Sequence, residues 1–182
     1  MPYTFVLTAT MPASAQEIYE TWLDSLGHSE MTGGEATMSD EVGAEVSAWD
    51  GYITGRNIEL IPGERIVQSW RTSEFGDEHG DSIITVLLEE IGDGTLLTLE
   101  HKNVPDEQRS YEESGWQSNY FEPMAAYFAA RQRKTARPAP KEAAAKKAHK
   151  AAPPKRRAKA KANVKANAQA KAKRKSRSKA AP

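Results

Sequence analysis

The sequence predicts an α+β fold in which a long C-terminal helix packs on an antiparallel sheet. Three observations predict it: turn signals of hairpins follow one another in mid-chain, an apolar stripe at helical spacing comes next, and the composition changes after residue 130. A long amphipathic helix must bury its stripe, and a sheet face is the available partner. We expect one domain over residues 1–130 and a disordered basic tail over residues 131–182.

The sequence predicts one strand and one helix in the N-terminal part of the chain. Residues 3–10 are rich in aromatic and β-branched side chains, as strands are. Ser14 and Glu17 have the spacing of a capping box, which begins a helix. The helical stripe consists of Ile18, Tyr19, Trp22, Leu23 and Leu26. We expect Gly27 to end this helix, and residues 29–43 are too polar to assign.

Three turn signals divide the middle of the chain into antiparallel strands. An Asp-Gly pair is a strong hairpin signal, and Pro-Gly fits a type II turn. Asp50-Gly51 separates residues 45–49 from 52–61, Pro62-Gly63 separates that strand from residues 64–72, and Asp93-Gly94 separates residues 82–91 from 95–102. Consecutive hairpins predict a meander.

A second helix is predicted after Pro105. Trp116, Tyr120, Met124 and Phe128 recur every four residues and form one apolar stripe. Pro123 lies inside this pattern and should kink or restart the helix, because proline lacks the backbone N–H.

Several classes of function lack their sequence signals. The chain has no cysteine, so it has neither disulfides nor thiolate metal sites. No apolar run approaches the roughly 20 residues that span a bilayer, and the N-terminus lacks the features of a signal peptide. The four histidines lack zinc-site spacing, and neither a phosphate loop nor a nucleophile elbow is present. We expect no catalytic residue, no metal and no cofactor.

The two parts of the chain carry opposite charge. Residues 1–130 hold 24 acidic and five basic side chains, a formal charge of −19, whereas residues 131–182 hold 20 basic side chains and one acidic, a charge of +19. Such asymmetry is typical of an acidic domain with an arm for polyanions.

The basic tail predicts electrostatic binding of DNA or RNA without base specificity. Its Lys/Ala/Pro-rich composition resembles the arms of linker histones and of some bacterial nucleoid proteins. A plain solubility tail is the alternative. The residues expected to meet phosphates are Lys146, Lys147, Lys150, Lys155, Arg156, Arg157, Lys159, Lys161, Lys171, Lys173, Arg174, Lys175, Arg177 and Lys179. We expect a cytoplasmic protein, associated with the nucleoid, or a nuclear one if the source is eukaryotic.

Four segments of the chain resemble a known family in their order and sequence. They are residues 49–55 (WDGYITG), 59–71 (ELIPGERIVQSWR), 94–101 (GTLLTLEH) and 115–121 (GWQSNYF). Together they resemble the activator of Hsp90 ATPase homologue family, specifically its C-terminal-type domain, over residues 3–130. This family belongs to the START/Bet v 1-like (SRPBCC) superfamily.

The resemblance implies the helix-grip fold, in which a curved antiparallel sheet grips the C-terminal helix, often around an apolar cavity. It brings no catalytic motif. The eukaryotic co-chaperone of this family makes its main Hsp90 contact through a separate N-terminal domain. We expect no such domain before Met1, and therefore no appreciable ATPase activation by this chain alone.

Five residues are candidates for lining or serving a cavity. The implied fold places Trp70 and Trp116 on the strand and helix that enclose it, and Tyr120 lies on the same helical stripe. Arg71 and His101 lie on predicted strands, where each would orient a ligand carboxylate or polar headgroup if it faced the cavity. The alternative for both is a structural ion pair or an exposed position.

Three functions follow, in this order. The first is a non-enzymatic binding module with a ligand cavity and a nucleic-acid-binding tail. The second is an Hsp90 co-chaperone-like protein that uses the tail for solubility. The third is a cavity enzyme of the same superfamily, ranked last because no paired acid and base can be placed together in the sequence.

Overall fold

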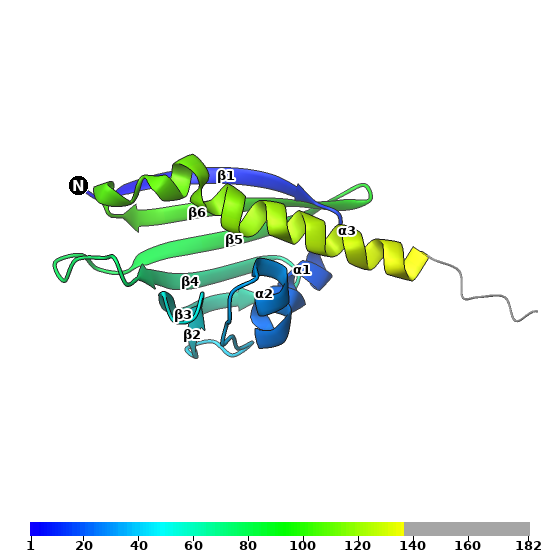
Figure 1. Ribbon diagram of the computed structural model, residues 1–182, viewed down its shortest axis with the longest axis horizontal. Helices are drawn as coiled ribbons and strands as arrows, with labels where there is room; N and C mark the ends of the chain where they lie inside the picture. The colour runs from blue at the N-terminus through cyan, green and yellow to red at the C-terminus, as the bar shows by residue number, and fades with distance from the viewer. Residues whose placement is uncertain (137–182) are drawn as a thin grey trace, which may run out of the picture. The chain divides into compact units, whose positions relative to one another are not determined.

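A six-stranded antiparallel sheet, with helices on one of its faces, makes up the computed structural model, which describes residues 1–136 (Figure 1). The strands are β1 (Tyr3–Met11), β2 (Glu45–Ala48), β3 (Ile53–Ile61), β4 (Arg65–Thr72), β5 (Ser82–Ile91) and β6 (Gly94–Val104), and their order across the sheet is β1-β6-β5-β4-β3-β2. The helices are α1 (Ala15–Leu23), α2 (Ser25–Thr32) and α3 (Glu122–Ala136). The predicted α+β class is confirmed.

The predicted hairpins are present, with one shift of register. Gly63 has φ 68° and the Glu64 N–H donates to the Ile61 carbonyl over 3.0 Å, as a type II turn requires. The last turn lies one residue earlier than predicted, because Gly92 takes the positive φ, 53°, and Gly94 already pairs with Ile91.

The first predicted helix is divided into two. The Ser14 cap is confirmed, since its hydroxyl accepts from the Glu17 N–H over 3.2 Å. However, α1 ends at Leu23, and extended Asp24 begins α2 by accepting from the Gly27 N–H over 2.6 Å. Gly27 therefore lies inside a helix instead of ending one. Leu26 is 68% exposed and does not belong to the buried stripe.

The C-terminal helix changes from π- to α-helical geometry at Glu122, directly before Pro123, where the sequence predicts a kink or restart. Two π-helical turns, Tyr111–Gly115 and Gln117–Phe121, follow the 3-10 turn Asp106–Gln108, and α3 begins at Glu122. The four stripe residues, Trp116 to Phe128, are all buried. The helix continues to Ala136, past residue 130, where we predicted the domain to end. All fourteen nucleic-acid-binding candidates and the predicted disorder beyond Ala136 lie outside the described residues.

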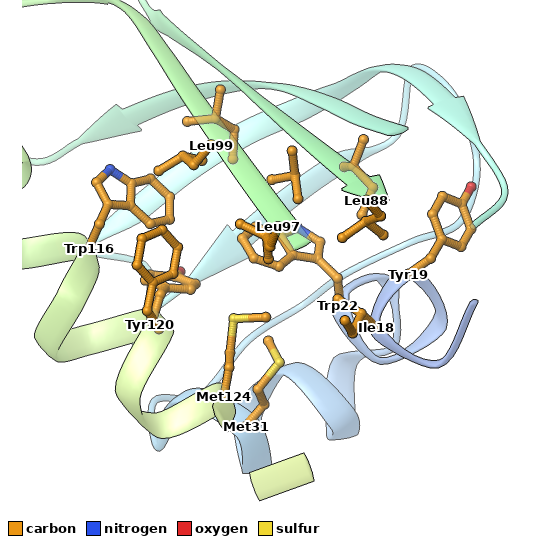
Figure 2. Packing of buried hydrophobic residues seen from close by; sticks show 14 of the residues in the cluster. Ile18, Tyr19, Trp22, Met31, Leu88, Leu97, Leu99, Trp116, Tyr120 and Met124 are labelled. Atoms are coloured by element: carbon orange, nitrogen blue, oxygen red, sulfur yellow. The ribbon is translucent and has the colours of Figure 1, made fainter. Parts of the chain in front are cut away.

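The core lies between the sheet and the helices. Trp22 of α1, Met31 of α2 and Met124 of α3 belong to one buried cluster with Leu97 and Leu99 of β6 (Figure 2).

A buried series of side-chain hydrogen bonds connects α1 to the sheet. The Trp22 indole N–H donates to Gln68 over 3.1 Å, and Gln68 donates to Asn57 over 2.7 Å. Gln68 and Asn57 are almost completely buried, and their hydrogen bonds fix the strands beneath α1.

Replacing Gly55 by alanine should destabilise the protein by about 3–5 kcal/mol, because a Cβ there would lie 1.9 Å from the Ser69 carbonyl oxygen of β4. Gly55 pairs directly with Trp70, so the strands would separate where Trp70 is presented. Gly80→Ala is the matched control, since its Cβ would come no closer than 3.8 Å to Asn103. Urea denaturation of both variants gives the comparison, and equal stabilities would contradict this account of β3–β4 packing.

Candidate functional site

An aromatic pocket of about 290 Å³ lies between the β2–β4 end of the sheet and the π-helical turns. Its lining comprises Trp49, Tyr52, Ile53, Trp70, Tyr111, Gly115, Trp116, Asn119 and Tyr120. Three of the five candidate residues, Trp70, Trp116 and Tyr120, are among them. Two wider grooves elsewhere on residues 1–136, about 540 and 650 Å³, have walls of mixed polar and apolar character.

The indoles and Tyr120 form a continuous aromatic wall. The ring centroids of Trp116 and Tyr120 are 4.7 Å apart, and those of Trp70 and Trp116 are 5.3 Å apart. Trp49 closes the opposite end, with its centroid 6.5 Å from that of Tyr120. Figure 2 shows Trp116 and Tyr120 projecting from the helical segment toward the sheet. Such contacts fix the ring positions and preform the pocket.

Trp49 is held in a backbone conformation that is rare for tryptophan. Its φ is 54°, in the left-handed region, and Asp50 and Gly51 follow it there. Gly34 lies flat against the indole, where a Cβ would come within 2.8 Å of the ring, and the Asp50 N–H donates to the Glu35 carbonyl over 3.0 Å. Strained residues of this kind persist where neighbouring structure fixes them, often at binding sites.

Two tyrosine hydroxyls of the lining, those of Tyr52 and Tyr111, form a hydrogen-bonded pair. The Tyr52 and Tyr111 hydroxyls are hydrogen-bonded to each other over 2.9 Å, and both rings are half-buried. Burial raises the pKa of Tyr111, and the charge of Glu74 raises it further. The Tyr111 phenol therefore remains a neutral hydrogen-bonding group at neutral pH.

His101 lies behind the pocket wall and positions Trp116. The indole N–H of Trp116 donates to His101 Nδ1 over 3.1 Å, so the ring proton must be on Nε2, which donates to the Ser82 hydroxyl over 2.8 Å. Ser82 in turn donates to the Trp70 carbonyl. Burial lowers the pKa of His101 to about 3, which keeps the ring neutral. His101 therefore does not line the pocket, so the condition under which it would orient a ligand is not met.

His28 fixes Tyr120 in a similar way from the opposite side. His28 Nδ1 is 2.9 Å from the Trp22 carbonyl oxygen, which only accepts, so Nδ1 carries the proton. Nε2 is then free to accept from the Tyr120 hydroxyl over 3.4 Å. Burial lowers the pKa of His28 to about 4, although the bond to Trp22 opposes this effect.

Arg71 also lies away from the pocket, because it alternates with Trp70 on β4. Its guanidinium donates to the carbonyls of His79 over 2.8 Å and Gly76 over 3.1 Å, and it pairs with Asp81 at 3.4 Å. Arg71 thus organises the β4–β5 loop, which is the structural alternative considered for it.

The pocket has the chemistry of a binding site. None of its nine lining residues is a carboxylate, imidazole or amine that would act as a general acid or base near neutral pH. Within residues 1–136, no group of three or more His, Asp or Glu side chains is placed to hold a metal ion. In the same part of the chain, no helix is both long enough and apolar enough to span a membrane.

Sequence reasoning missed half of the aromatic lining. Trp49 and Tyr52 flank the Asp50-Gly51 turn at the ends of predicted strands, and Tyr111 lies in a segment without helical periodicity. The one available signal was the concentration of aromatic residues around that turn, in the segment that carries the family resemblance.

Comparison with known proteins identifies related chains. A family model described as "Activator of Hsp90 ATPase homolog 1-like protein" matches residues 12–129. The human activator of 90 kDa heat shock protein ATPase homolog 1 is 26% identical over 122 residues, which cover 67% of this chain and 36% of that protein. The Dictyostelium discoideum homologue is also 26% identical, over 65% of this chain and 31% of that protein. The chain spans about a third of the length of these curated relatives.

Solved structures share the fold. An Hsp90 activator from Plasmodium falciparum superposes with a TM-score of 0.62 at 20% identity, covering 69% of this chain and 96% of that chain. Protein CV1439 from Chromobacterium violaceum gives 0.57 at 26% identity over the same shares. The predicted helix-grip fold is confirmed. Because the family model covers most of the chain, this protein belongs to the Activator of Hsp90 ATPase homolog 1-like family.

Proposed function

We propose that this chain is a non-enzymatic binding protein, whose pocket takes a small apolar molecule and whose basic residues 131–182 bind nucleic acid. The preformed aromatic pocket is the observation that supports ligand binding. Its volume is near the lower end of the roughly 300–1,000 Å³ typical of ligand pockets, which favours a ligand of one or two rings over a sterol. The absence of an acid or base from the lining favours binding over catalysis.

Blocking the pocket mouth should weaken binding without disturbing the fold. Asn119 is exposed and lines the pocket, whereas the exposed neighbour Ser118 does not line it. We expect Asn119→Phe to weaken the binding of small aromatic compounds, such as indole or naphthalene, by at least about tenfold, and Ser118→Phe to leave it unchanged. Calorimetric titration of the full chain measures both. A panel of aromatic compounds, fatty acids and sterols that shows no saturable binding would contradict the proposal.

The tail proposal rests on charge. Twenty basic residues among the 52 of the tail offer many phosphate contacts, and the tail has no aromatic side chain on which bases would stack. Binding should therefore be electrostatic and insensitive to base sequence.

A link to Hsp90 is the second candidate, favoured by family membership and by relatives that are themselves described as activators of its ATPase. We propose that any such link is direct binding of Hsp90 without appreciable acceleration of its ATP turnover by this chain alone. Pull-down with purified Hsp90 and a coupled ATPase assay separate the outcomes. A several-fold rise in turnover would make the co-chaperone function primary.

A further inference from the structure

Aromatic rings surround the pocket almost completely. Six of its nine lining residues are aromatic: Trp49, Tyr52, Trp70, Tyr111, Trp116 and Tyr120. The remaining three, Ile53, Gly115 and Asn119, are uncharged. The faces of aromatic rings carry partial negative charge and attract cations, and indole does so most strongly. A cluster with three indoles is therefore suited to a positively charged group as well as to an apolar one.

Acidic residues adjoin the pocket lining in the sequence, and one of them acts on a lining residue. Asp50 follows Trp49, Glu112 follows Tyr111, and both acids are exposed. Glu74 is close enough for its charge to act on the Tyr111 hydroxyl. The basic residue nearest in sequence to the wall, Arg71, directs its guanidinium into the β4–β5 loop. The net charge of −19 over residues 1–130 adds a long-range attraction for cations.

The hydrogen-bonding groups of the pocket favour one kind of cation, a quaternary ammonium, over a primary ammonium. A primary ammonium has three N–H groups and requires acceptors. No carboxylate lines the pocket, and its acceptors are neutral: the Tyr52 and Tyr111 hydroxyl oxygens, which are hydrogen-bonded to each other, and the Asn119 amide. The Trp116 N–H is bound to His101 and points away from the pocket. A fully alkylated ammonium has no N–H to satisfy, and its methyl groups pack against rings.

We propose that the pocket binds an organic cation with a quaternary ammonium group, which lies among the six aromatic rings. This inference rests on the pocket-binding function proposed above and adds the chemical class of the ligand. The same features disfavour anionic ligands, because the lining holds no cation to pair with a carboxylate or phosphate.

Phenyltrimethylammonium and its neutral isostere tert-butylbenzene test the charge alone, since the two have nearly the same shape. Titration of the full chain, followed by NMR at low ionic strength, should show the cation binding about 2- to 30-fold more tightly than the isostere. Added salt should weaken binding of the cation only. Tighter or equal binding of the isostere overturns the inference and leaves the proposed function standing, whereas binding of neither overturns both.

A charge variant gives an independent readout. Glu74→Gln should weaken binding of the cation about twofold or more and leave the isostere unaffected. Glu89→Gln is the matched control, because Glu89 lies toward the opposite end of β5 from Ser82, the partner of Trp70, and should change neither affinity. Equal affinities of the cation for wild type and Glu74→Gln would count against the acidic surroundings as part of the site.

Discussion

Raising the salt concentration from about 50 to about 200 mM should weaken binding of the full chain to duplex DNA by roughly 10³–10⁵-fold, if about six to ten tail cations contact phosphates together. Each contact releases counterions from the DNA, and salt opposes that release. Electrophoretic shift or fluorescence anisotropy measures the affinity. Duplexes of unrelated sequence should give the same curve, because phosphates carry no base information.

Two comparisons assign the effect to the tail. Replacing Lys155, Arg156 and Arg157 by glutamine should reduce the slope of log affinity against log salt by up to about 3, whereas Lys102→Gln, on β6, should not change it. The peptide of residues 131–182 should bind more tightly than the full chain at low salt, because the −19 charge of residues 1–130 repels phosphates. A full chain that fails to shift DNA at about 50 mM salt, or that binds independently of salt, would refute the proposal.

Acidification should destabilise the domain through its two buried histidines. The pKa of His28 is about 4 and that of His101 about 3 in the folded state, below the ordinary value of 6.5. Below pH 6.5 the unfolded chain takes up protons that the folded chain does not, so stability is lost as the pH falls and levels off near these folded pKa values. Each histidine contributes on the order of 3–5 kcal/mol to the loss.

Histidine variants separate the contribution of His28 and His101 to the pH dependence of stability from that of the many carboxylates. Denaturant unfolding at pH 7, 6, 5 and 4 gives the slope of the unfolding free energy against pH. His101→Gln and His28→Asn should each reduce this slope by up to about 1.4 kcal/mol per pH unit, whatever their effect at pH 7. Slopes identical to that of the wild type would mean that the rings are not kept neutral by burial.

The fold was predictable where local signals and tertiary packing agree. Pro62-Gly63 forms its turn, Ser14 caps its helix, and the stripe from Trp116 to Phe128 is buried. The local sequence signals gave a wrong helix boundary where a side chain outside the apolar stripe determined the structure. Asp24 offered a carboxylate to the Gly27 N–H and began a second helix, which placed Gly27 in a helix and exposed Leu26.

The site was predictable only in part. The alternation of side chains along a strand fixes which face of the sheet each side chain points to, but not which residues it contacts there. Trp70 and Arg71 are neighbours on β4, so only one of them can face inward, and the inward residue is Trp70. His101 also points inward, yet the Trp116 indole covers it and takes its Nδ1 as an acceptor. That arrangement depends on contacts between distant segments, which periodicity does not reveal.

The central claim, that the aromatic pocket binds a small molecule, can be tested on the chain's four indole N–H signals, assigned with single Trp→Phe variants. Titration of the ¹⁵N-labelled full chain with phenyltrimethylammonium or tert-butylbenzene should shift the signals of Trp49, Trp70 and Trp116 saturably. The signal of Trp22, bonded to Gln68 outside the pocket lining, should move least. Unchanged signals with both compounds, or equal shifts of all four, would contradict the claim.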